Sequence, residues 1–470
     1  MPDKQWVHFI GIGGAGMSGI AKCLLELGYH VTGSDLLATE TTKRLENWGA
    51  RIFTGHRQEN LDPLVDLVVV SSAIPKDNAE LMKAVALEIP VIQRAEMLGR
   101  LMEIQKGIAV AGAHGKTTTT SMISLMLEKN GYDPTVVVGG ELNDIGGNAK
   151  LGKGEYLVAE ADESDGSFLK LKPFITVVTN VEDDHLDYYG TRENIEKAFR
   201  QFIKNTHPGG FSVLCFDDPV LQRLIPGLKR EKRIVTYGFN NNADFYADDA
   251  VLNGHTTKTI IFQGRKRLGE IHLSIPGKHN LLNALAAVAV GINAGLSFEG
   301  IACSLQPFRG VQRRFQVIGE VDGIAIYDDY AHHPTELKTT LAAARTLKPG
   351  RIVAVFQPHR YTRTQLLARE FGSAFRQADV LIVNEVYSAG EKPIPGVSAK
   401  LIVDQIKEST GQEVEYIQDK SDIVKRLGEI VRPGDLVITM GAGNIWTAGV
   451  DLYRRLGEKK GEVKGDENEN

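Results

Sequence analysis

The sequence predicts an α/β protein of three domains, each with a mostly parallel β-sheet covered by helices. Two observations support this prediction. The chain has 470 residues, which is too long for one hydrophobic core and suggests roughly three domains. Strand-like apolar runs also alternate with helical patterns along the chain, which is typical of parallel sheets with helices on both faces.

The first predicted domain covers residues 1–100. It begins with the buried strand pattern VHFIGIG, and the amphipathic helix pattern GMSGIAKCLLEL follows. Two further strand patterns, HVTGSD and LVDLVVVSSA, precede a helical segment around RAEMLGRLMEI. A glycine-rich turn between the first strand and the first helix is typical of Rossmann-like domains, so we expect that fold here.

The second predicted domain, residues 101–312, opens with the strand GIAVAG, a second glycine-rich turn and the helix pattern TTTTSMISLMLEKNG. This order predicts a P-loop ATPase-like domain with a mostly parallel sheet. Residues 313–455 repeat the strand-then-helix order and predict a second Rossmann-like domain. Residues 456–470 are charged and lack apolar periodicity, so we expect a disordered tail.

Composition excludes several classes of protein. The formal net charge is −5 and no half of the chain is a basic block, so binding dominated by nucleic-acid phosphates is not expected. The three cysteines, Cys23, Cys215 and Cys303, fit no metal-binding spacing and indicate a reducing compartment. Neither a signal peptide pattern nor an apolar run of membrane-spanning length occurs. The sequence therefore predicts a cytoplasmic protein without membrane insertion.

The first glycine-rich turn is a candidate diphosphate site, because glycines permit close backbone approach and the following helix offers free N–H groups. Asp35 ends the next strand, where dinucleotide-binding domains place their ribose acid. On these residues alone, a ligand-free turn, an NAD site and a UDP-sugar site all remain open. The residues of this turn are Gly11, Gly13, Gly14, Ala15 and Gly16.

The second glycine-rich turn is a shortened phosphate-binding loop, in which the usual first glycine would fall on Val110. Its backbone N–H groups would hold the ATP phosphates, Lys116 would reach the β- and γ-oxygens, and the Thr117 hydroxyl would ligate Mg²⁺. The alternative is a chance match at a strand–helix turn. The residues of the loop are Gly112, Ala113, His114, Gly115, Lys116 and Thr117.

Two acidic clusters follow strands of the same predicted domain, where open α/β sheets bind ligands. Magnesium prefers oxygen ligands, so two clusters after a phosphate loop favour a metal–nucleotide site over a solvated acidic loop. Strand alternation would place Glu160 and Asp162 on one face, and the choice among Asp162, Glu163 and Asp165 stays open. The clusters are Glu160, Asp162, Glu163 and Asp165 in the first, and Glu182, Asp183, Asp184 and Asp187 with His185 in the second.

The segments GAHGKTTTT, AEADESDGSF, TNVEDDHLDYYGT and YDDYAHHPTE resemble the motifs of the Mur ligases, ATP-dependent amide-forming enzymes of peptidoglycan synthesis. The resemblance extends from about residue 5 to about residue 455. It implies Mg²⁺ as cofactor and ATP as co-substrate. The residues that it assigns to ATP are the loop residues above with Thr118, Asn280, Asn283, Arg314, Asp328 and Asp329. The metal ligands that it implies are Thr117, Glu160 and His185.

The same resemblance implies catalytic roles for Lys116, His185, Arg314 and His333. It makes the first loop a UDP-sugar site, with Asp35 and Ser72 nearer the uridine. Further segments, SSAIP, VFQPHRYTRT and VYSAGEKPIPGVS, imply UDP-N-acetylmuramate and L-alanine as substrates, joined through an acyl-phosphate intermediate. The residues implied for the amino acid are Tyr330, His359, Arg360 and Arg363.

Several alternatives remain beside this interpretation. A sister ligase that adds a preformed tripeptide would share the sugar and nucleotide sites, and an NAD-dependent oxidoreductase would explain only the first loop. His332 could equally be a turn histidine, and Arg360 and Arg363 could form surface salt bridges. The chain also departs from the family pattern, with Phe199 where other members carry a carbamylated lysine. We therefore expect no carbamate here.

Overall fold

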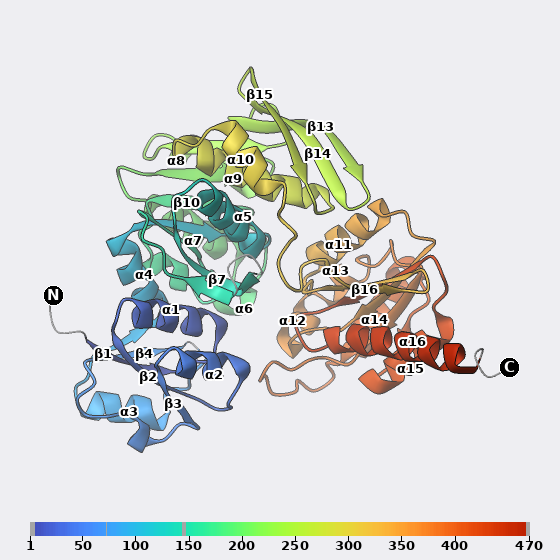
Figure 1. Cartoon of the computed structure of the whole chain (residues 1–470), viewed down its shortest axis with the longest axis horizontal. Coiled ribbons are helices and arrows are strands. Elements are labelled where there is room, and N and C mark those ends of the chain that lie inside the picture. The colour runs from blue at the N-terminus through green and yellow to red at the C-terminus, as the bar shows by residue number, and fades with distance from the viewer. Residues whose placement is uncertain (1–4, 72, 143–146, 467–470) are drawn as a thin grey trace. The chain divides into compact units, whose positions relative to one another are not determined.

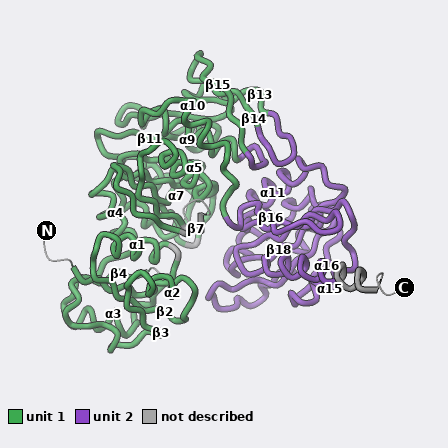
Figure 2. The backbone as a smooth tube through the Cα atoms, viewed as in Figure 1, with its two compact units in different colours: residues 1–250, 258–273, 280–311 green, residues 251–257, 274–279, 312–470 purple. Residues whose placement is uncertain are grey.

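The computed structural model describes residues 5–71, 73–142 and 147–466, and its strands form three sheets (Figure 1). By contacts the chain divides into two compact units (Figure 2). Unit 1 contains residues 1–250, 258–273 and 280–311, and unit 2 contains residues 251–257, 274–279 and 312–470. The first two sheets belong mainly to unit 1 and the third to unit 2.

The first sheet has the strand order β3-β2-β1-β4-β5, and its described pairings are all parallel. This is the Rossmann strand order 3-2-1-4-5-6 without its sixth strand, so the predicted Rossmann-like fold is observed. Its strands are β1 (Trp6–Ile10), β2 (His30–Asp35), β3 (Arg51–Thr54), β4 (Leu67–Val70) and β5 (Val91–Gln93). Its helices are α1 (Ala15–Glu26), α2 (Glu40–Asn47), α3 (Ala79–Ala86) and α4 (Arg94–Ile104).

The second sheet has the order β15-β14-β13-β12-β11-β10-β6-β9-β7-β8. Pairings from β13 to β7 are parallel, whereas β7 and β8 are antiparallel. Its strands are β6 (Lys106–Ala111), β7 (Thr135–Leu142), β8 (Gly147–Lys150), β9 (Tyr156–Glu160), β10 (Ile175–Val178), β11 (Phe211–Cys215), β12 (Ile234–Gly238), β13 (Phe245–Asn253), β14 (Thr256–Gln263) and β15 (Lys266–Leu273). The helices of this region are α5 (Lys116–Lys129), α6 (Leu186–Tyr189), α7 (Arg192–Lys204), α8 (Pro219–Leu228), α9 (Lys278–Asn293) and α10 (Phe298–Leu305).

The third sheet has the order β16-β17-β21-β18-β19-β20, with only the edge pair β16–β17 antiparallel among the described pairings. Separate apolar clusters contain residues of alternate orientation along its strands, as expected for a sheet with helices on both faces. Its strands are β16 (Gln316–Val321), β17 (Ile324–Asp329), β18 (Arg351–Phe356), β19 (Val380–Val383), β20 (Glu415–Tyr416) and β21 (Asp435–Met440). Its helices are α11 (Pro334–Thr346), α12 (Tyr361–Leu366), α13 (Ala368–Phe371), α14 (Ala399–Thr410), α15 (Lys420–Ile430) and α16 (Trp446–Asp466).

The predicted three-domain α/β fold is confirmed by these three sheets. One local expectation differs from the structure. Helix α16 continues to Asp466, through most of the tail that we expected to be disordered from residue 456, and residues 467–470 lie outside the described part. Lys and Glu are good helix formers and no proline interrupts the segment, so a helix already started at Trp446 can continue through it.

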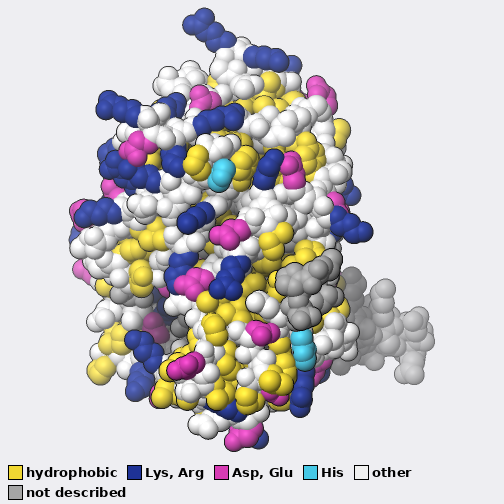
Figure 3. Space-filling model, turned by 90° about the vertical axis from the view of Figure 1, so that its left-hand side faces the viewer, with side chains coloured by type: hydrophobic (Ala, Val, Ile, Leu, Met, Phe, Trp, Pro, Cys, Tyr) yellow, Lys and Arg dark blue, Asp and Glu magenta, His cyan; other side chains and the backbone are white. Residues whose placement is uncertain are grey.

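Two further observations concern the charges on the surface and the length of the helices. On the face shown in Figure 3, Lys and Arg side chains are interspersed with acidic and hydrophobic side chains. Among residues 5–71, 73–142 and 147–466, no helix combines the length and the apolar character that crossing a bilayer requires.

Candidate active site

The first glycine-rich turn connects β1 to α1 and is held by Asp35 at the end of β2. The Gly13 N–H donates to Asp35 Oδ2 at 2.8 Å, and the N–H groups of Gly11 and Ile12 donate to the Ser34 carbonyl. Gly11 has a φ of +83°. The Asp35 side chain therefore stabilises this turn by accepting a hydrogen bond from the turn's backbone. The sequence did not predict this role.

Helix α1 begins at Ala15, and its N-cap Gly14 provides no side-chain hydrogen bond. No acidic side chain lies in the first turn of the helix. Backbone N–H groups at such a start attract anions. The predicted contact Ser72 lies outside the described residues.

The second glycine-rich turn connects β6 to α5 and requires its glycines. Gly112 and Gly115 have φ values of +137° and +82°. A Cβ on Gly112 would lie 2.1 Å from Thr179 Oγ1, and one on Gly115 would lie 2.7 Å from Asn283 Oδ1. Backbone conformation and space therefore both select glycine at these two positions.

Lys116, the first residue of α5, folds back over this turn. Its Nζ donates to the Gly112 carbonyl at 2.5 Å, to the Ala113 carbonyl at 3.2 Å and to Glu163 Oε1 at 2.7 Å. Burial opposes the charge on the amine, but the adjacent Glu163 carboxylate outweighs burial and raises the pKa of Lys116. Lys116 therefore stays protonated, and its amine lies against the carbonyls of the turn.

The acidic segment after β9 divides into acids with different partners. Asp162 Oδ2 accepts from Arg94 at 3.2 Å, and its Oδ1 accepts from the Ser164 N–H. Asp165 Oδ1 accepts from the N–H of Ser167. Glu163 alone of the three acids left open by the sequence contacts Lys116. Because β9 ends at Glu160, strand alternation does not extend to Asp162.

Two carboxylate oxygens in this segment are buried without a hydrogen-bond partner. They are Glu160 Oε1 and Glu163 Oε2. Burial, followed by the neighbouring charge of Asp162, raises the pKa of Glu163 despite the opposing effect of Lys116. Buried oxygens without partners are rare in proteins and call for an explanation such as an absent ion.

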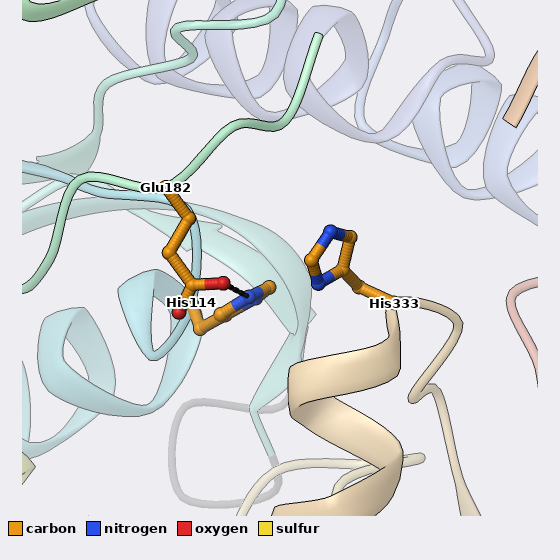
Figure 4. A group of neighbouring side chains, drawn as sticks. All are labelled: His114, Glu182 and His333. Carbon is orange, nitrogen blue, oxygen red and sulfur yellow. Dashed lines mark hydrogen bonds and ion pairs between the residues drawn. The ribbon is translucent and has the colours of Figure 1, made fainter. Parts of the chain in front are cut away.

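The loop after β10 brings three predicted or neighbouring residues to the second turn. His185 Nε2 lies 3.8 Å from Glu163 Oε1, and the His185 backbone has a φ of +59°. His114 Nε2 lies 3.3 Å from Glu182 Oε2, the contact drawn as a dashed line in Figure 4. Asn180 Oδ1 accepts from the His114 N–H at 2.9 Å. Asn180 was missed at the sequence level, because its contact depends on β10 lying beside β6.

Helix α9 carries Asn280 and Asn283 to the start of α5. Thr119 Oγ1 donates to Asn283 Oδ1 at 3.1 Å, and Asn283 Nδ2 donates to Asn280 Oδ1 at 3.3 Å. Both asparagines are buried, as is Thr118. Phe199, where a carbamylated lysine was excluded, is 2% exposed and packs edge-on against Phe168.

In unit 2, the predicted acids Asp328 and Asp329 end β17 and bond within the unit. Asp328 accepts from Thr439 Oγ1 on one oxygen and from Arg313 Nε on the other. Asp329 accepts from the N–H groups of Ala331 and Phe315, each at 2.7 Å. Burial raises the pKa of Asp329 to about 6, although the Arg314 charge opposes this.

The ring of Tyr330 contacts the guanidinium groups of two arginines. The guanidinium carbons of Arg313 and Arg314 lie 4.9 and 5.2 Å from its ring centroid. Arg313 also donates to the Gly441 carbonyl at 2.6 Å, whereas Arg314 makes a longer contact of 3.4 Å with Glu336. Arg313 thus connects β17 to the loop after β21 within unit 2.

His332 and His333 precede α11 and share Glu336. The N–H groups of both histidines donate to Glu336 Oε2, at 2.9 and 3.2 Å. His333 is the N-cap of α11, and its Nδ1 accepts from the Thr335 N–H at 3.4 Å. Figure 4 shows the His333 side chain at the beginning of that helix. A capping role is therefore established for His333, beside any catalytic role.

The segment after β18 gathers His359, Arg360 and Arg363. His359 stacks on Tyr387, and Arg363 Nη1 lies 3.4 Å from His359 Nδ1. Burial and then the two arginines lower the pKa of His359 to about 4, so the ring is neutral at pH 7. Arg360 has a φ of +69°, a costly conformation for a side chain of this size.

Sequence profiles of three Mur ligase domains match this chain in succession. The Mur ligase family catalytic domain matches residues 6–106, the Mur ligase middle domain residues 110–291, and the Mur ligase glutamate ligase domain residues 313–443. The chain is 57% identical to the UDP-N-acetylmuramate–L-alanine ligase of Pelotomaculum thermopropionicum, over 98% of this chain and 99% of the relative. The chain belongs to the Mur ligase family.

Further relatives are also ligases of this family. This Mur ligase is 56% identical to the UDP-N-acetylmuramate–L-alanine ligase of Desulforamulus reducens, over 97% of this chain and 99% of that one. Its fold is similar to the crystal structure of UDP-N-acetylmuramate–alanine ligase from Thermotoga maritima, with a TM-score of 0.81, 30% identity and coverage of 96% and 99%. A murein peptide ligase from Psychrobacter arcticus gives a TM-score of 0.71 at 25% identity, with coverage of 96% and 99%.

Proposed function

We propose that this Mur ligase joins L-alanine to the lactyl carboxylate of UDP-N-acetylmuramate in peptidoglycan biosynthesis, with conversion of ATP to ADP and phosphate. The observation that carries the proposal is identity of 57% and 56%, over nearly the whole chain, to two ligases named for this reaction. Similarity to the murein peptide ligase is lower, at 25% identity. Free alanine is therefore favoured over a preformed tripeptide, and no observation favours an oxidoreductase.

We assign one substrate to each predicted domain. Residues 1–100 would bind the UDP-sugar at the β1–α1 turn, where backbone N–H groups meet the start of a helix. Residues 101–312 would bind ATP at the β6–α5 turn beside Lys116. Residues 313–455 would bind the amino acid and complete the nucleotide site with Arg314, Asp328 and Asp329. This division agrees with the general placement of ligands at strand-to-helix turns.

In the first chemical step, an oxygen of the lactyl carboxylate attacks the γ-phosphorus of ATP and ADP leaves, which gives an acyl phosphate. The carboxylate and the triphosphate repel each other, so the site needs positive charge. Lys116 supplies it, because Glu163 keeps the amine protonated and the turn carbonyls fix its position. The N–H groups at the start of α5 would hold the phosphate oxygens.

The residues around Glu163 fit a magnesium ion. Glu160 Oε1 and Glu163 Oε2 are buried oxygens without partners, and His185 Nε2 lies 3.8 Å from the other oxygen of Glu163. Two carboxylates suit a hard cation that keeps several waters, so Glu160, Glu163 and His185 would hold it, with the hydroxyl of Thr117. When bound, Mg²⁺ would offset negative charge on the phosphate oxygens.

In the second step, the alanine nitrogen attacks the acyl carbon, a tetrahedral intermediate forms, and phosphate leaves as the amine loses a proton. The alanine carboxylate needs a cationic partner. Because His359 is neutral at pH 7, Arg360 and Arg363 would provide that charge, and His359 with Tyr330 would shape the pocket. Guanidinium groups bind carboxylates with two parallel hydrogen bonds, which orients the amine.

ADP release tests the proposal. We expect release that requires both UDP-N-acetylmuramate and L-alanine, with less product from glycine or L-serine and none from the tripeptide. A tripeptide that supports faster turnover than alanine would replace the proposal with the recycling reaction. Oxidation of NADH by the same sugar would indicate an oxidoreductase instead.

A further inference from the structure

Arg94 is the first residue of α4, a helix that contacts α1 (Figure 1). A Cβ on Gly16, the second residue of α1, would lie 2.8 Å from Arg94 Nη1 and 3.1 Å from its Cδ. Any side chain at position 16 would therefore displace the guanidinium. Glycine at this position makes room for the arginine, in addition to any ligand.

The other side of the guanidinium contacts the ATP domain. Arg94 Nη2 donates to Asp162 Oδ2 at 3.2 Å, and Asp162 directly precedes Glu163, the partner of Lys116. Residues 16, 94 and 162 all belong to unit 1. One side chain thus connects the proposed UDP-sugar turn to the acidic segment of the proposed phosphate-transfer site.

The position of Arg94 is fixed by its surroundings. Gln93 and Glu96 form a capping box around the start of α4. Lys170 Nζ reaches both of these residues, at 2.8 Å from Gln93 Oε1 and 2.6 Å from Glu96 Oε1. The backbone that carries Arg94 is therefore anchored to the ATP domain.

A guanidinium at the beginning of a helix is electrostatically unfavourable, because the helix start carries partial positive charge. The first turn of α1 has no acid and its N-cap makes no side-chain hydrogen bond. Asp162 is the acid to which Arg94 is bonded among the described residues, and its side chain is 42% exposed. A second anion at the start of α1 would relieve the repulsion between the guanidinium and the helix.

We propose that Arg94 is a positioning residue that bonds the diphosphate of the UDP-sugar on one side and Asp162 on the other. Occupation of the sugar turn would then hold the Asp162–Glu163 segment in the arrangement that Lys116 requires. This inference rests on the proposed function and adds a residue to its sugar site. A simple surface ion pair is the competing explanation, and such pairs contribute little to stability.

Binding of nucleotide fragments by titration calorimetry tests the diphosphate contact. Arg94→Gln should weaken UDP binding at least about tenfold, because charge-assisted bonds to phosphate are strong, and should leave uridine binding unchanged. Arg94→Lys keeps the charge and should lose less affinity than Arg94→Gln. The matched control is Arg100→Gln, an exposed arginine of the same helix, which should bind UDP like the parent. Equal UDP affinity in Arg94→Gln and the parent would overturn the proposal.

The sugar arm identifies the anion. UDP-N-acetylglucosamine lacks the lactyl carboxylate, so the loss of affinity in Arg94→Gln should be the same for it and for UDP-N-acetylmuramate. A loss confined to UDP-N-acetylmuramate would assign Arg94 to the carboxylate and contradict the diphosphate contact. Thermal melting of each variant without ligand checks that the fold is retained.

The contact with Asp162 is tested by a double-mutant cycle on the KM for the UDP-sugar. Asp162→Asn should raise this KM, and the double variant Arg94→Gln/Asp162→Asn should resemble Arg94→Gln alone. Fully additive effects would show that the two residues act independently. If the parent protein forms product and Arg94→Gln has the same KM for the UDP-sugar as the parent, only this inference is contradicted. A parent that neither binds UDP nor releases ADP contradicts the proposed function.

Discussion

Two pairs of carboxylates in this Mur ligase differ in whether their oxygens are satisfied. In the central domain, Glu160 Oε1 and Glu163 Oε2 are buried without hydrogen-bond partners. At the end of β17, each oxygen of Asp328 and Asp329 accepts a hydrogen bond from its own unit. The resemblance to the family had implied ligand contacts for acids of both pairs, and the sequence alone did not distinguish them.

This difference separates two functions of a buried acid. A carboxylate with an unfilled oxygen retains the desolvation cost of that atom until a cation or donor arrives. A carboxylate whose oxygens accept from backbone N–H groups stabilises a loop and has less capacity left for a ligand. We therefore expect substitutions in the central domain to affect catalysis, and substitutions at the end of β17 to affect stability more.

Lys116→Met should give the largest effect, because it removes the cation shared by Glu163 and the transferring phosphate. We expect kcat to fall at least about 100-fold, in line with the loss of a preorganised donor at a developing charge. Binding of the UDP-sugar should be unchanged, since the residue belongs to the second turn. The readouts are ADP release and calorimetric titration with UDP-N-acetylmuramate. Lys129→Met, at the exposed end of the same helix, is the control, and full turnover by Lys116→Met would refute the loop assignment.

Glu163→Gln should act mainly through the metal. The amide oxygen of the glutamine can still accept a hydrogen bond from Lys116. The variant lacks the negative charge that, in our proposal, binds magnesium. We expect the Mg²⁺ concentration for half-maximal rate to rise at least about tenfold. The free energy of unfolding should also fall, because the buried Lys116 amine loses its charged partner.

Asp165→Asn provides the contrast to Glu163→Gln. Asp165 accepts from the Ser167 N–H in its own turn, and the asparagine oxygen can replace that contact. Its Mg²⁺ dependence should match the parent. If Asp165→Asn rather than Glu163→Gln raised the requirement for Mg²⁺, the metal would lie on the other side of the acidic segment.

The fold and the phosphate loop could be predicted because their signals are local. A strand, a glycine-rich turn and a helix follow one another directly, so the spacing in the sequence was enough to single out Gly112, Gly115 and Lys116. The choice of Glu163 among the acids could not be predicted, since β9 ends at Glu160. After Glu160, the side chains of Asp162 and Asp165 accept hydrogen bonds from N–H groups of their own turn. Strand alternation therefore no longer indicates where the side chains point.

Contacts that depend on strand order were also beyond the sequence. Asn180 reaches His114 because β10 pairs with β6, although β10 comes far later in the chain than β6. Arg94 and Asp162 belong to different predicted domains and meet through the packing of those domains. The hydrogen bond that the Phe315 N–H donates to Asp329 likewise depends on the β16–β17 pairing.

The clearest effect on stability should come from Asp329→Asn. The asparagine can accept from only one of the two N–H groups, so the other N–H loses its partner, at a cost of about 1–3 kcal/mol. A pH dependence accompanies this cost. Because the folded-state pKa is raised from 3.8 to about 6, the Asp329 carboxyl contributes stability that is fully present below pH 4 and is lost as pH rises through 6.

The variant lacks this titration, so the stability advantage of the parent over Asp329→Asn should narrow between pH 4.5 and pH 7. A shift of about two pKa units corresponds to at most about 3 kcal/mol, and denaturant titration at several pH values measures the difference. Asp322→Asn is a suitable control, since this acid lies at the exposed β16–β17 turn. If the stability difference between the parent and Asp329→Asn widened as pH rises, the folded state would favour the ionised carboxylate. Asp329 would then resemble the carboxylates that we assign to the metal.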